Sequence, residues 1–231
     1  SSQTLLRGLR ELVPGGGKYR PGRDLSSRRL GEWCVYSDPF ANLSAIDDGC
    51  YASPPYDERG IVRLELNGGG VENPATVALV ALNAWHAMLL RPGAAKWGQL
   101  FYRHVDWLRD RLDVGEDGAG RWFYRFEPPA QDVAVPWVSC FAQGLGASVL
   151  LRAAQHCEGE SYLTASRRAA RLLDVPVSSG GVRCDEDGLT FLEEYPQDPP
   201  SHVLNGFISA VLALLETEKV LGDSAEKWLA P

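Results

Sequence analysis

The sequence predicts a mainly α-helical protein, an incomplete α/α toroid built from helix–helix–hairpin repeats. Three observations lead to this fold class. Apolar residues recur at helical spacing from residue 73 onward, prolines stand before the first helix of each unit at positions 74, 136 and 200, and segment 120–128 aligns without a gap with segment 188–196. One helix pair with its short β-hairpin cannot bury its apolar faces alone, so the repeated units must stack against one another.

The first 72 residues are expected to form an irregular lead-in instead of a repeat. Pro, Gly and Asp break this part into short apolar pieces, and only residues 61–66 alternate like a strand. Residues 1–29 form a basic N-terminal arm with seven basic and two acidic side chains. A solvated, partly disordered arm explains this composition better than an arm that guides polyanions.

The toroid domain is predicted to span residues 73–231. Asn73 followed by Pro74 has the form of an N-cap and a first helical residue, so we expect a helix from here to Leu90. A second helix is expected over residues 94–112, where apolar side chains recur at spacings of three and four. Residues 121–126 then alternate like a strand.

The same order of elements recurs after this first unit. We expect a helix after Pro136, another over residues 161–173, and a short strand around residues 190–195. A third unit opens at Pro200 with a helix to about residue 220, but only residues 224–231 remain for its second helix. The domain is therefore predicted to be cut in its third repeat, with about five long helices in antiparallel pairs.

An incomplete toroid leaves one apolar helix face without its neighbour. On the last predicted helix this face consists of Phe207, Val211, Leu214 and Leu215. We expect it to be covered by the lead-in or by a second copy of the chain, so that a homo-oligomer would close the open end.

Composition excludes several classes of function. The formal charge of −7 argues against a general nucleic-acid-binding protein, which neutralises phosphates with a basic face. No run approaches the roughly 20 apolar residues of a membrane span, and no signal-peptide core is present, so a soluble protein is expected. The 19 arginines against 4 lysines indicate a GC-rich and hence bacterial genome, although the compartment stays unknown.

Metal and nucleotide cofactors are also not expected. The five cysteines are odd in number and contain no CxxC pair, and the four histidines show no metal-ligand spacing. No Gly-rich phosphate loop follows a predicted strand. The chemistry is therefore expected to rest on the side chains of the protein.

The most informative stretch is FLEEYP at residues 191–196 followed by SHVLNGF at residues 201–207. It resembles the signature of glucuronyl C5-epimerases, the enzymes that modify heparan and heparosan. The resemblance continues in PWVS at 136–139 and AQG at 142–144, more loosely in NPAT at 73–76, and covers roughly residues 56–215. It implies an isomerase that converts D-glucuronate to L-iduronate, or a related uronate, within an acidic polysaccharide.

In that family the Glu-Tyr pair of the signature lies in the active-site cleft, which implies that Glu194 and Tyr195 are catalytic here. Epimerisation at C5 removes a proton from one face of the sugar ring and returns one to the other. Glu194 is the candidate base, and Tyr195 is the candidate acid or a phenol that binds the uronate carboxylate. Neighbouring Glu193, placed with the substrate-binding residues, could raise the pKa of Glu194 by like-charge repulsion. Adjacent strand residues point to opposite faces, so the pair shares a pocket only at a bend.

Five further residues are candidates for substrate binding, each with a structural alternative. Tyr124 and Arg125 could stack on the sugar and pair with its carboxylate, or Tyr124 could face the core and Arg125 the solvent. Trp137 is expected to be a packing residue more than a stacking platform. Gln143 and Asn205 could bind hydroxyl groups or only tie loops to helix ends.

Two rival functions stay open at this point. A uronate polysaccharide lyase, or a glycosidase, would suit the same fold, and a lyase begins with the same removal of the C5 proton. A non-catalytic glycan-binding module or decayed epimerase is the rival from another class, because the family's downstream tyrosines and arginine-containing segment lie past Pro231 and its preceding β-domains are not recognisable.

Overall fold

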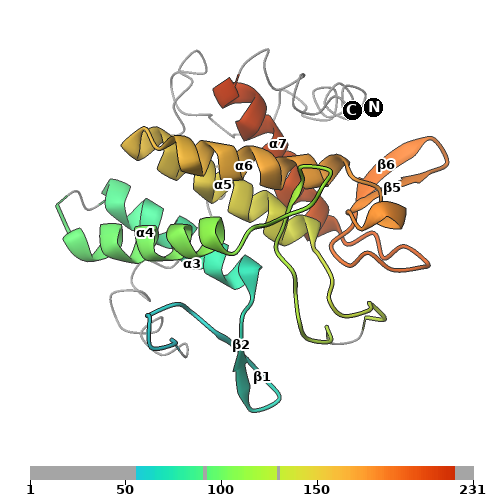
Figure 1. Ribbon diagram of the computed structural model, residues 1–231, viewed down its shortest axis with the longest axis horizontal. Coiled ribbons are helices and arrows are strands. Elements are labelled where there is room, and N and C mark those ends of the chain that lie inside the picture. Colours follow the sequence, from blue (N-terminus) through green and yellow to red (C-terminus); the bar gives the residue numbers. More distant parts are fainter. Residues whose placement is uncertain (1–55, 91–92, 129–130, 222–231) are drawn as a thin grey trace.

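The chain folds into five α-helices and three small β-hairpins within the part that the structure describes (Figure 1). The computed structural model describes residues 56–90, 93–128 and 131–221. The helices are α3 (Pro74–Leu90), α4 (Ala95–Asp110), α5 (Cys140–Cys157), α6 (Glu160–Arg171) and α7 (Leu204–Leu221). The antiparallel strand pairs are β1 (Leu64–Leu66) with β2 (Gly69–Val71), β3 (Asp113–Val114) with β4 (Gly120–Arg121), and β5 (Arg183–Glu186) with β6 (Leu189–Leu192). The predicted mainly α class is confirmed.

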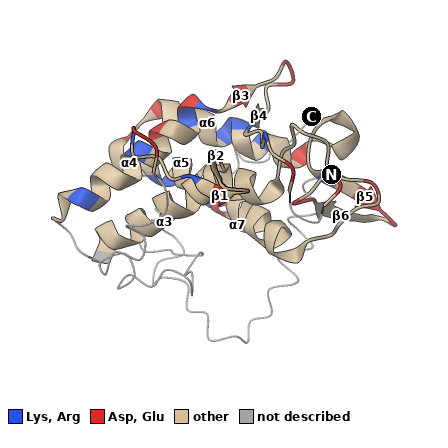
Figure 2. Cartoon of the chain, turned by 90° about the horizontal axis from the view of Figure 1, so that it is seen from below, with Lys and Arg blue, Asp and Glu red and all other residues tan. Residues whose placement is uncertain are grey.

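The helices form two layers that follow the repeat. The first helices of the three units lie side by side, since α5 contacts both α3 and α7, while the second helices α4 and α6 pack outside their partners. Figure 2 shows most charged residues along α4, α6 and the hairpins, and few on α3 and α5. Helices that are apolar all round are stable only when other elements cover them, which explains why α3 and α5 lie inside.

Two helix starts differ from the predicted ones. Asn73 caps α3 as expected, because its Oδ1 accepts a hydrogen bond of 3.0 Å from the Thr76 N–H. Helices α5 and α7, however, begin four residues after Pro136 and Pro200. For α5 the cap is Ser139, whose hydroxyl accepts from the Phe141 N–H, and a side-chain cap fixes a helix start more strongly than a nearby proline does.

The predicted strand over residues 121–126 is largely wrong. Only Gly120–Arg121 pairs as a strand, and Tyr124 forms an isolated bridge with Trp137. The Trp122 N–H between them donates instead to the Oε1 atom of buried Gln143. The alternation in this segment therefore reflects two buried aromatic side chains and not a continuous strand ladder.

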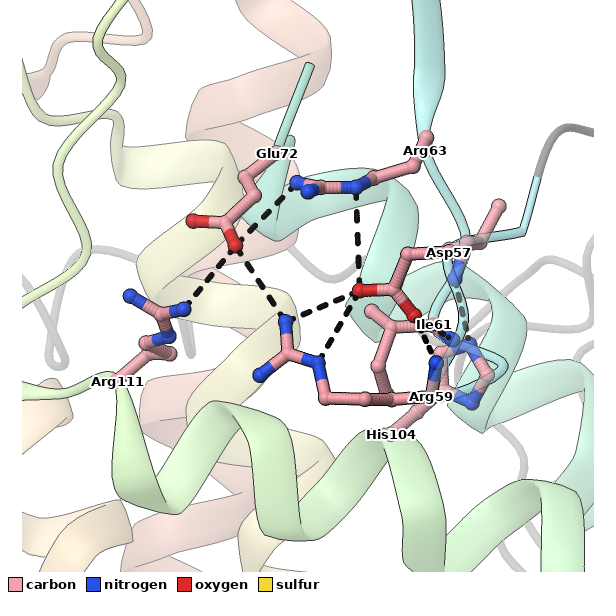
Figure 3. A network of polar contacts seen from close by, with 8 residues as sticks. Asp57, Arg59, Ile61, Arg63, Glu72, His104 and Arg111 are labelled. Atoms are coloured by element: carbon pink, nitrogen blue, oxygen red, sulfur yellow. Dashed lines mark hydrogen bonds and ion pairs between the residues drawn. The ribbon is translucent and has the colours of Figure 1, made fainter. Parts of the chain in front are cut away.

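The described end of the lead-in is part of the fold. Ile61 and Val62 are buried in the main core cluster, and ion pairs join Asp57 and Glu72 to three arginines (Figure 3). These arginines are Arg59, Arg63 and, at the end of α4, Arg111. The backbone N–H of Val62 donates to Nε2 of buried His104 on α4. Residues 1–55, which include the predicted basic arm, lie outside the described residues.

The apolar face expected to be open on the last helix is instead packed within the chain, and Val211 is buried as well. Leu214 belongs to a second core cluster, and Phe207 and Leu215 pack against that cluster. They therefore face the interior of the chain, because α7 uses this stripe to pack on α5 and β6. Leu204 and Ile208 are the large apolar side chains of α7 that are exposed among the described residues. That a second copy or the lead-in closes the open end of the domain stays a prediction.

Close contact between α5 and α7 rests on a glycine and a buried ion pair. A Cβ atom at Gly144 would lie 2.7 Å from the Cα of Ala210, so only glycine allows this approach. Arg152 of α5 and Glu216 of α7 pair at 2.6 Å with both side chains fully buried. The predicted second helix of the third unit, residues 224–231, lies outside the described residues. None of the described helices is both long and apolar enough to cross a membrane.

Candidate active site

The candidate catalytic pair lies in a bend directly after β6. The Glu193 N–H donates to the Val182 carbonyl at 2.7 Å, and the Glu193 carbonyl accepts from the Cys140 N–H at 3.0 Å. These bonds fasten the bend to the hairpin on one side and to the first turn of α5 on the other. Because strand geometry ends at Leu192, the alternation of a strand no longer forces Glu194 and Tyr195 apart.

Glu194 is a buried carboxylate that forms no ion pair with a cation among the described residues. Its side chain lies over Gly206 in the first turn of α7, where an added Cβ would come 2.7 Å from Glu194 Oε2. Burial raises the pKa of Glu194, and hydrogen bonding to Tyr195, Asn205 and the Gly206 N–H only partly opposes that rise. Oε2 accepts no well-formed hydrogen bond from the described part of the chain. This oxygen therefore keeps a lone pair that no described donor occupies.

Tyr195 stands beside this carboxylate as a neutral hydrogen-bond donor. Burial, followed by the charge of Glu194 and its hydrogen bond, raises the pKa of Tyr195 to about 12. The phenol consequently keeps its proton at neutral pH. Its ring lies 5.4 Å from that of Trp137, which holds the phenol against the loop that precedes α5.

Tyr124 and Trp137 form an aromatic wall that connects the bend to the loop before α5. The Tyr124 and Trp137 rings are stacked with centroids 4.0 Å apart, and Trp137 Nε1 donates to the Phe126 carbonyl at 2.8 Å. Burial raises the pKa of Tyr124, and the charge of Glu194 adds to this rise. The loops that precede α5 and α7 thus lie together on one side of the helices (Figure 1).

Three helix N-termini meet at this place. The backbone of Ala75 in α3 hydrogen-bonds Tyr124, Cys140 begins α5 beside Glu193, and Gly206 lies in the first turn of α7 below Glu194. The N-terminal end of a helix carries partial positive charge and favours an anion nearby. The arrangement can therefore stabilise negative charge that develops on a substrate.

Comparison with known proteins agrees with this assignment of the site. Residues 116–229 match the family described as D-glucuronyl C5-epimerase C-terminus. A D-glucuronyl C5-epimerase of Caenorhabditis elegans is 36% identical over 124 residues, which cover 52% of this chain and 20% of that protein. Residues 116–229 belong to the D-glucuronyl C5-epimerase C-terminal family.

A second similar protein comes from a different organism. An uncharacterized protein of Methanocaldococcus jannaschii is 32% identical over 112 residues, covering 47% of this chain and 36% of that protein. The chain thus matches about a fifth and about a third of the lengths of these two relatives. The matched epimerase segment contains β4, α5, α6, β5, β6 and the described α7, and so the whole bend with Glu194 and Tyr195.

Other predicted site residues of the epimerase domain have structural partners. Gln143 is fully buried, and its amide bonds to the Trp122 N–H and to the carbonyls of Gly120 and Ala169. Gln143 therefore ties neighbouring loops to the start of α5, which was the structural alternative. Its amide has no group left to bind a sugar hydroxyl. Trp137 is 6% exposed, in agreement with packing.

Glu193 also differs from its predicted role. Its carboxylate is fully buried and accepts hydrogen bonds from the Ser201 N–H, the Ser201 hydroxyl and the His202 N–H. It therefore organises the loop before α7. Burial is the main cause of the raised pKa of Glu194, and the charge of Glu193 is not among the causes. The expected like-charge mechanism is therefore not supported, since Glu193 faces the loop before α7 and Glu194 faces the first turn of that helix.

Asn205 and Arg125 are exposed and so remain candidates for substrate binding. Asn205 is exposed and hydrogen-bonds Glu194, and Arg125 is exposed with its guanidinium 6.0 Å from the Phe123 ring. Sequence reasoning missed Gly206, on which the Glu194 side chain lies. The Asn-Gly pair at the start of the predicted helix could have indicated this contact. A glycine within a helical pattern often marks a place where another group packs closely against the backbone.

Proposed function

We propose that the protein containing this domain epimerises uronate residues at C5 within an acidic polysaccharide, converting D-glucuronate to L-iduronate or a related pair. The observation that carries this proposal is the environment of Glu194. A buried carboxylate with a raised pKa, next to a protonated phenol and above a helix N-terminus, suits a general base that acts near neutral pH. The family of the surrounding segment and the name of the nematode relative support the same reaction.

In the proposed reaction, Glu194 breaks the C5–H bond and takes the proton on its carboxylate. The electron pair of that bond moves into the uronate carboxyl group as an enediolate. Helix N-termini and the Tyr195 hydroxyl stabilise this charge, which is more negative than that of the ground state. A proton then reaches C5 from a donor on the opposite face of the ring, because Tyr195 is hydrogen-bonded to Glu194 and lies on the side of the base. Exchange with water restores Glu194.

We propose that the sugar lies along the surface between the aromatic wall and the first turn of α7. Arg125 is an exposed cation on the loop before α5 and would pair with a uronate carboxylate. Asn205 is exposed beside Glu194 and would bind a ring hydroxyl group. The proposed proton transfer uses side chains and needs neither a nucleotide nor a metal cofactor.

The proposed architecture for this site is an α/α toroid. The side-by-side packing of α3, α5 and α7, with α4 and α6 outside, supports this arrangement. In a toroid the loops before successive inner helices lie at one rim, and here two such loops carry the candidate residues. Further helices would complete the ring.

The experiment is proton exchange in heavy water with the full-length protein and defined uronate polymers. Deuterium incorporated at C5, detected by NMR together with both uronate epimers, would support the proposal. An unsaturated product that absorbs in the ultraviolet would identify a lyase instead. Polymer binding without any exchange would identify a glycan-binding module.

A further inference from the structure

A second cluster of reactive side chains lies on the β5–β6 hairpin. Cys184 is paired with Phe191 across the two strands, and Glu186 is two residues further along the same strand. Side chains two residues apart, and those directly opposite in an antiparallel pair, point to the same face. Glu193, two residues beyond Phe191, continues this face just after β6. One side of the hairpin thus presents a thiol and two carboxylates.

His202 covers this face from the loop that precedes α7. Its ring contacts the Phe191 ring at 4.7 Å, and its Nε2 lies 3.4 Å from Glu193 Oε1 and 3.7 Å from Glu186 Oε2. The ligand atoms of Cys184, Glu193 and His202 all lie within 4.8 Å of one another. Three potential ligands from three separate segments therefore converge, and Glu186 lies next to the imidazole of His202.

The backbone at His202 is held in place for this arrangement. His202 has φ of 49°, in the left-handed region that non-glycine residues seldom adopt. Glu193 offsets the cost, since its Oε2 accepts from the N–H groups of Ser201 and His202, both at 3.1 Å. The other carboxylate oxygen, Oε1, is then directed at the imidazole. Strained residues held in this way are frequent at ligand sites.

Charge and spacing both favour a cation here. The thiol of Cys184 lies in the negative field of Glu193, Glu186 and Asp185. Arg183 is the cation of this hairpin, and it forms ion pairs with Asp174 and Asp185. Its charge is therefore neutralised by these carboxylates and not by Glu186 or Glu193. The ligand atoms of tetrahedral zinc lie roughly 3.3 to 3.8 Å apart, given metal–ligand distances of about 2.0 to 2.3 Å. The measured separations from Nε2 are close to this range.

We propose that Cys184, Glu193 and His202, with Glu186 as the fourth ligand, form a binding site for a divalent transition-metal ion of the zinc class. Thiolate, imidazole and carboxylate together suit zinc better than magnesium or calcium, which prefer oxygen ligands alone. A bound ion would connect the β5–β6 hairpin to the loop before α7. Because Glu193 immediately precedes Glu194, the ion would fix the bend that carries the candidate base, without touching the substrate.

The test uses the full-length protein, reduced and freed of metal, and Zn²⁺ in equilibrium dialysis. We expect one tightly bound zinc ion at this site, and at least about 100-fold weaker binding after Cys184→Ser or His202→Gln, because loss of a direct ligand costs more than loss of its supporting partners. Cys157→Ser is the matched control, since Cys157 is an exposed free cysteine at the end of α5. It should bind zinc like the wild type.

Cobalt substitution gives a second measurement that does not depend on how well a variant folds. Co²⁺ bound to the wild-type protein should show the charge-transfer band of a thiolate ligand and the strong visible bands of tetrahedral coordination. Zinc should also slow hydrogen exchange in residues 193–203 of the wild type. Equal zinc affinity in the wild type and the Cys184 and His202 variants, or a cobalt spectrum without a thiolate band, would overturn the proposal and leave the cluster as an ion pair of His202 with two glutamates.

Discussion

Protonation of His104 should destabilise this fold over a defined pH range. The imidazole is fully buried, its Nε2 accepts from the Val62 N–H at 3.2 Å, and its Nδ1 lies 2.9 Å from the Leu100 carbonyl (Figure 3). These partners require the neutral tautomer with the proton on Nδ1. Burial first, and then the charge of Arg103, lower the pKa of His104 from 6.5 to about 4, while the Leu100 carbonyl and Asp57 oppose the shift.

The sign of the effect follows from proton binding. Between pH 6.5 and 4 the unfolded chain binds a proton at His104 and the folded chain does not, so the stability falls as the pH is lowered through this range. The shift from 6.5 to about 4 corresponds to roughly 2 to 3 kcal/mol lost between pH 7.5 and 4.5. His104→Gln removes this term, because an amide oxygen can accept from Val62 but does not titrate.

Urea unfolding followed by tryptophan fluorescence measures the difference. The wild type should lose about 2 to 3 kcal/mol more than His104→Gln between these two pH values, whatever the stability of the variant at pH 7.5. Equal losses in the wild type and His104→Gln would refute the buried, neutral state of His104.

Three further substitutions test the helix packing and the site. Glu216→Gln should destabilise the fold by about 3 to 5 kcal/mol in urea unfolding, because it leaves Arg152 charged in the core. The double variant Arg152→Met with Glu216→Leu removes both charges and should recover most of this loss. Gly206→Ala should lower C5 exchange about 10- to 100-fold by displacing Glu194, whereas Gly98→Ala, where an added Cβ meets nothing within 4 Å, should leave exchange unchanged. Tyr195→Phe should also slow exchange while polymer binding persists, and normal exchange in Gly206→Ala or Tyr195→Phe would contradict the geometry of the site.

Local signals in the sequence predicted the helices better than the loops. Asn73 and Pro74 mark the start of α3 because an N-cap acts within one turn. The strand expected over residues 121–126 failed because the Trp122 N–H bonds to Gln143, which is distant in sequence and whose burial no local pattern reveals. Repeat spacing, in contrast, reports on stacking and correctly indicated the order of the elements.

The candidate site was predictable only in part. The Glu-Tyr signature led to Glu194 and Tyr195, and the requirement for a bend at this place is met, since β6 ends at Leu192. The different environments of Glu193 and Glu194 could not be predicted from the sequence. The conformation of the bend decides that Glu193 faces Ser201 and Glu194 faces Gly206. Side chains that meet across a hairpin and a later loop, as at Cys184, leave no fixed spacing in the sequence.

The central claim is that Glu194 removes the C5 proton, and Glu194→Gln tests it most directly. Gln keeps the shape of the side chain and loses the base, so the full-length variant should bind the uronate polymer but incorporate no deuterium at C5 in heavy water. Glu127→Gln, which replaces an exposed glutamate on the loop before α5, is the matched control and should exchange like the wild type. Deuterium incorporation by Glu194→Gln at the wild-type rate would contradict the claim and assign the base to another residue.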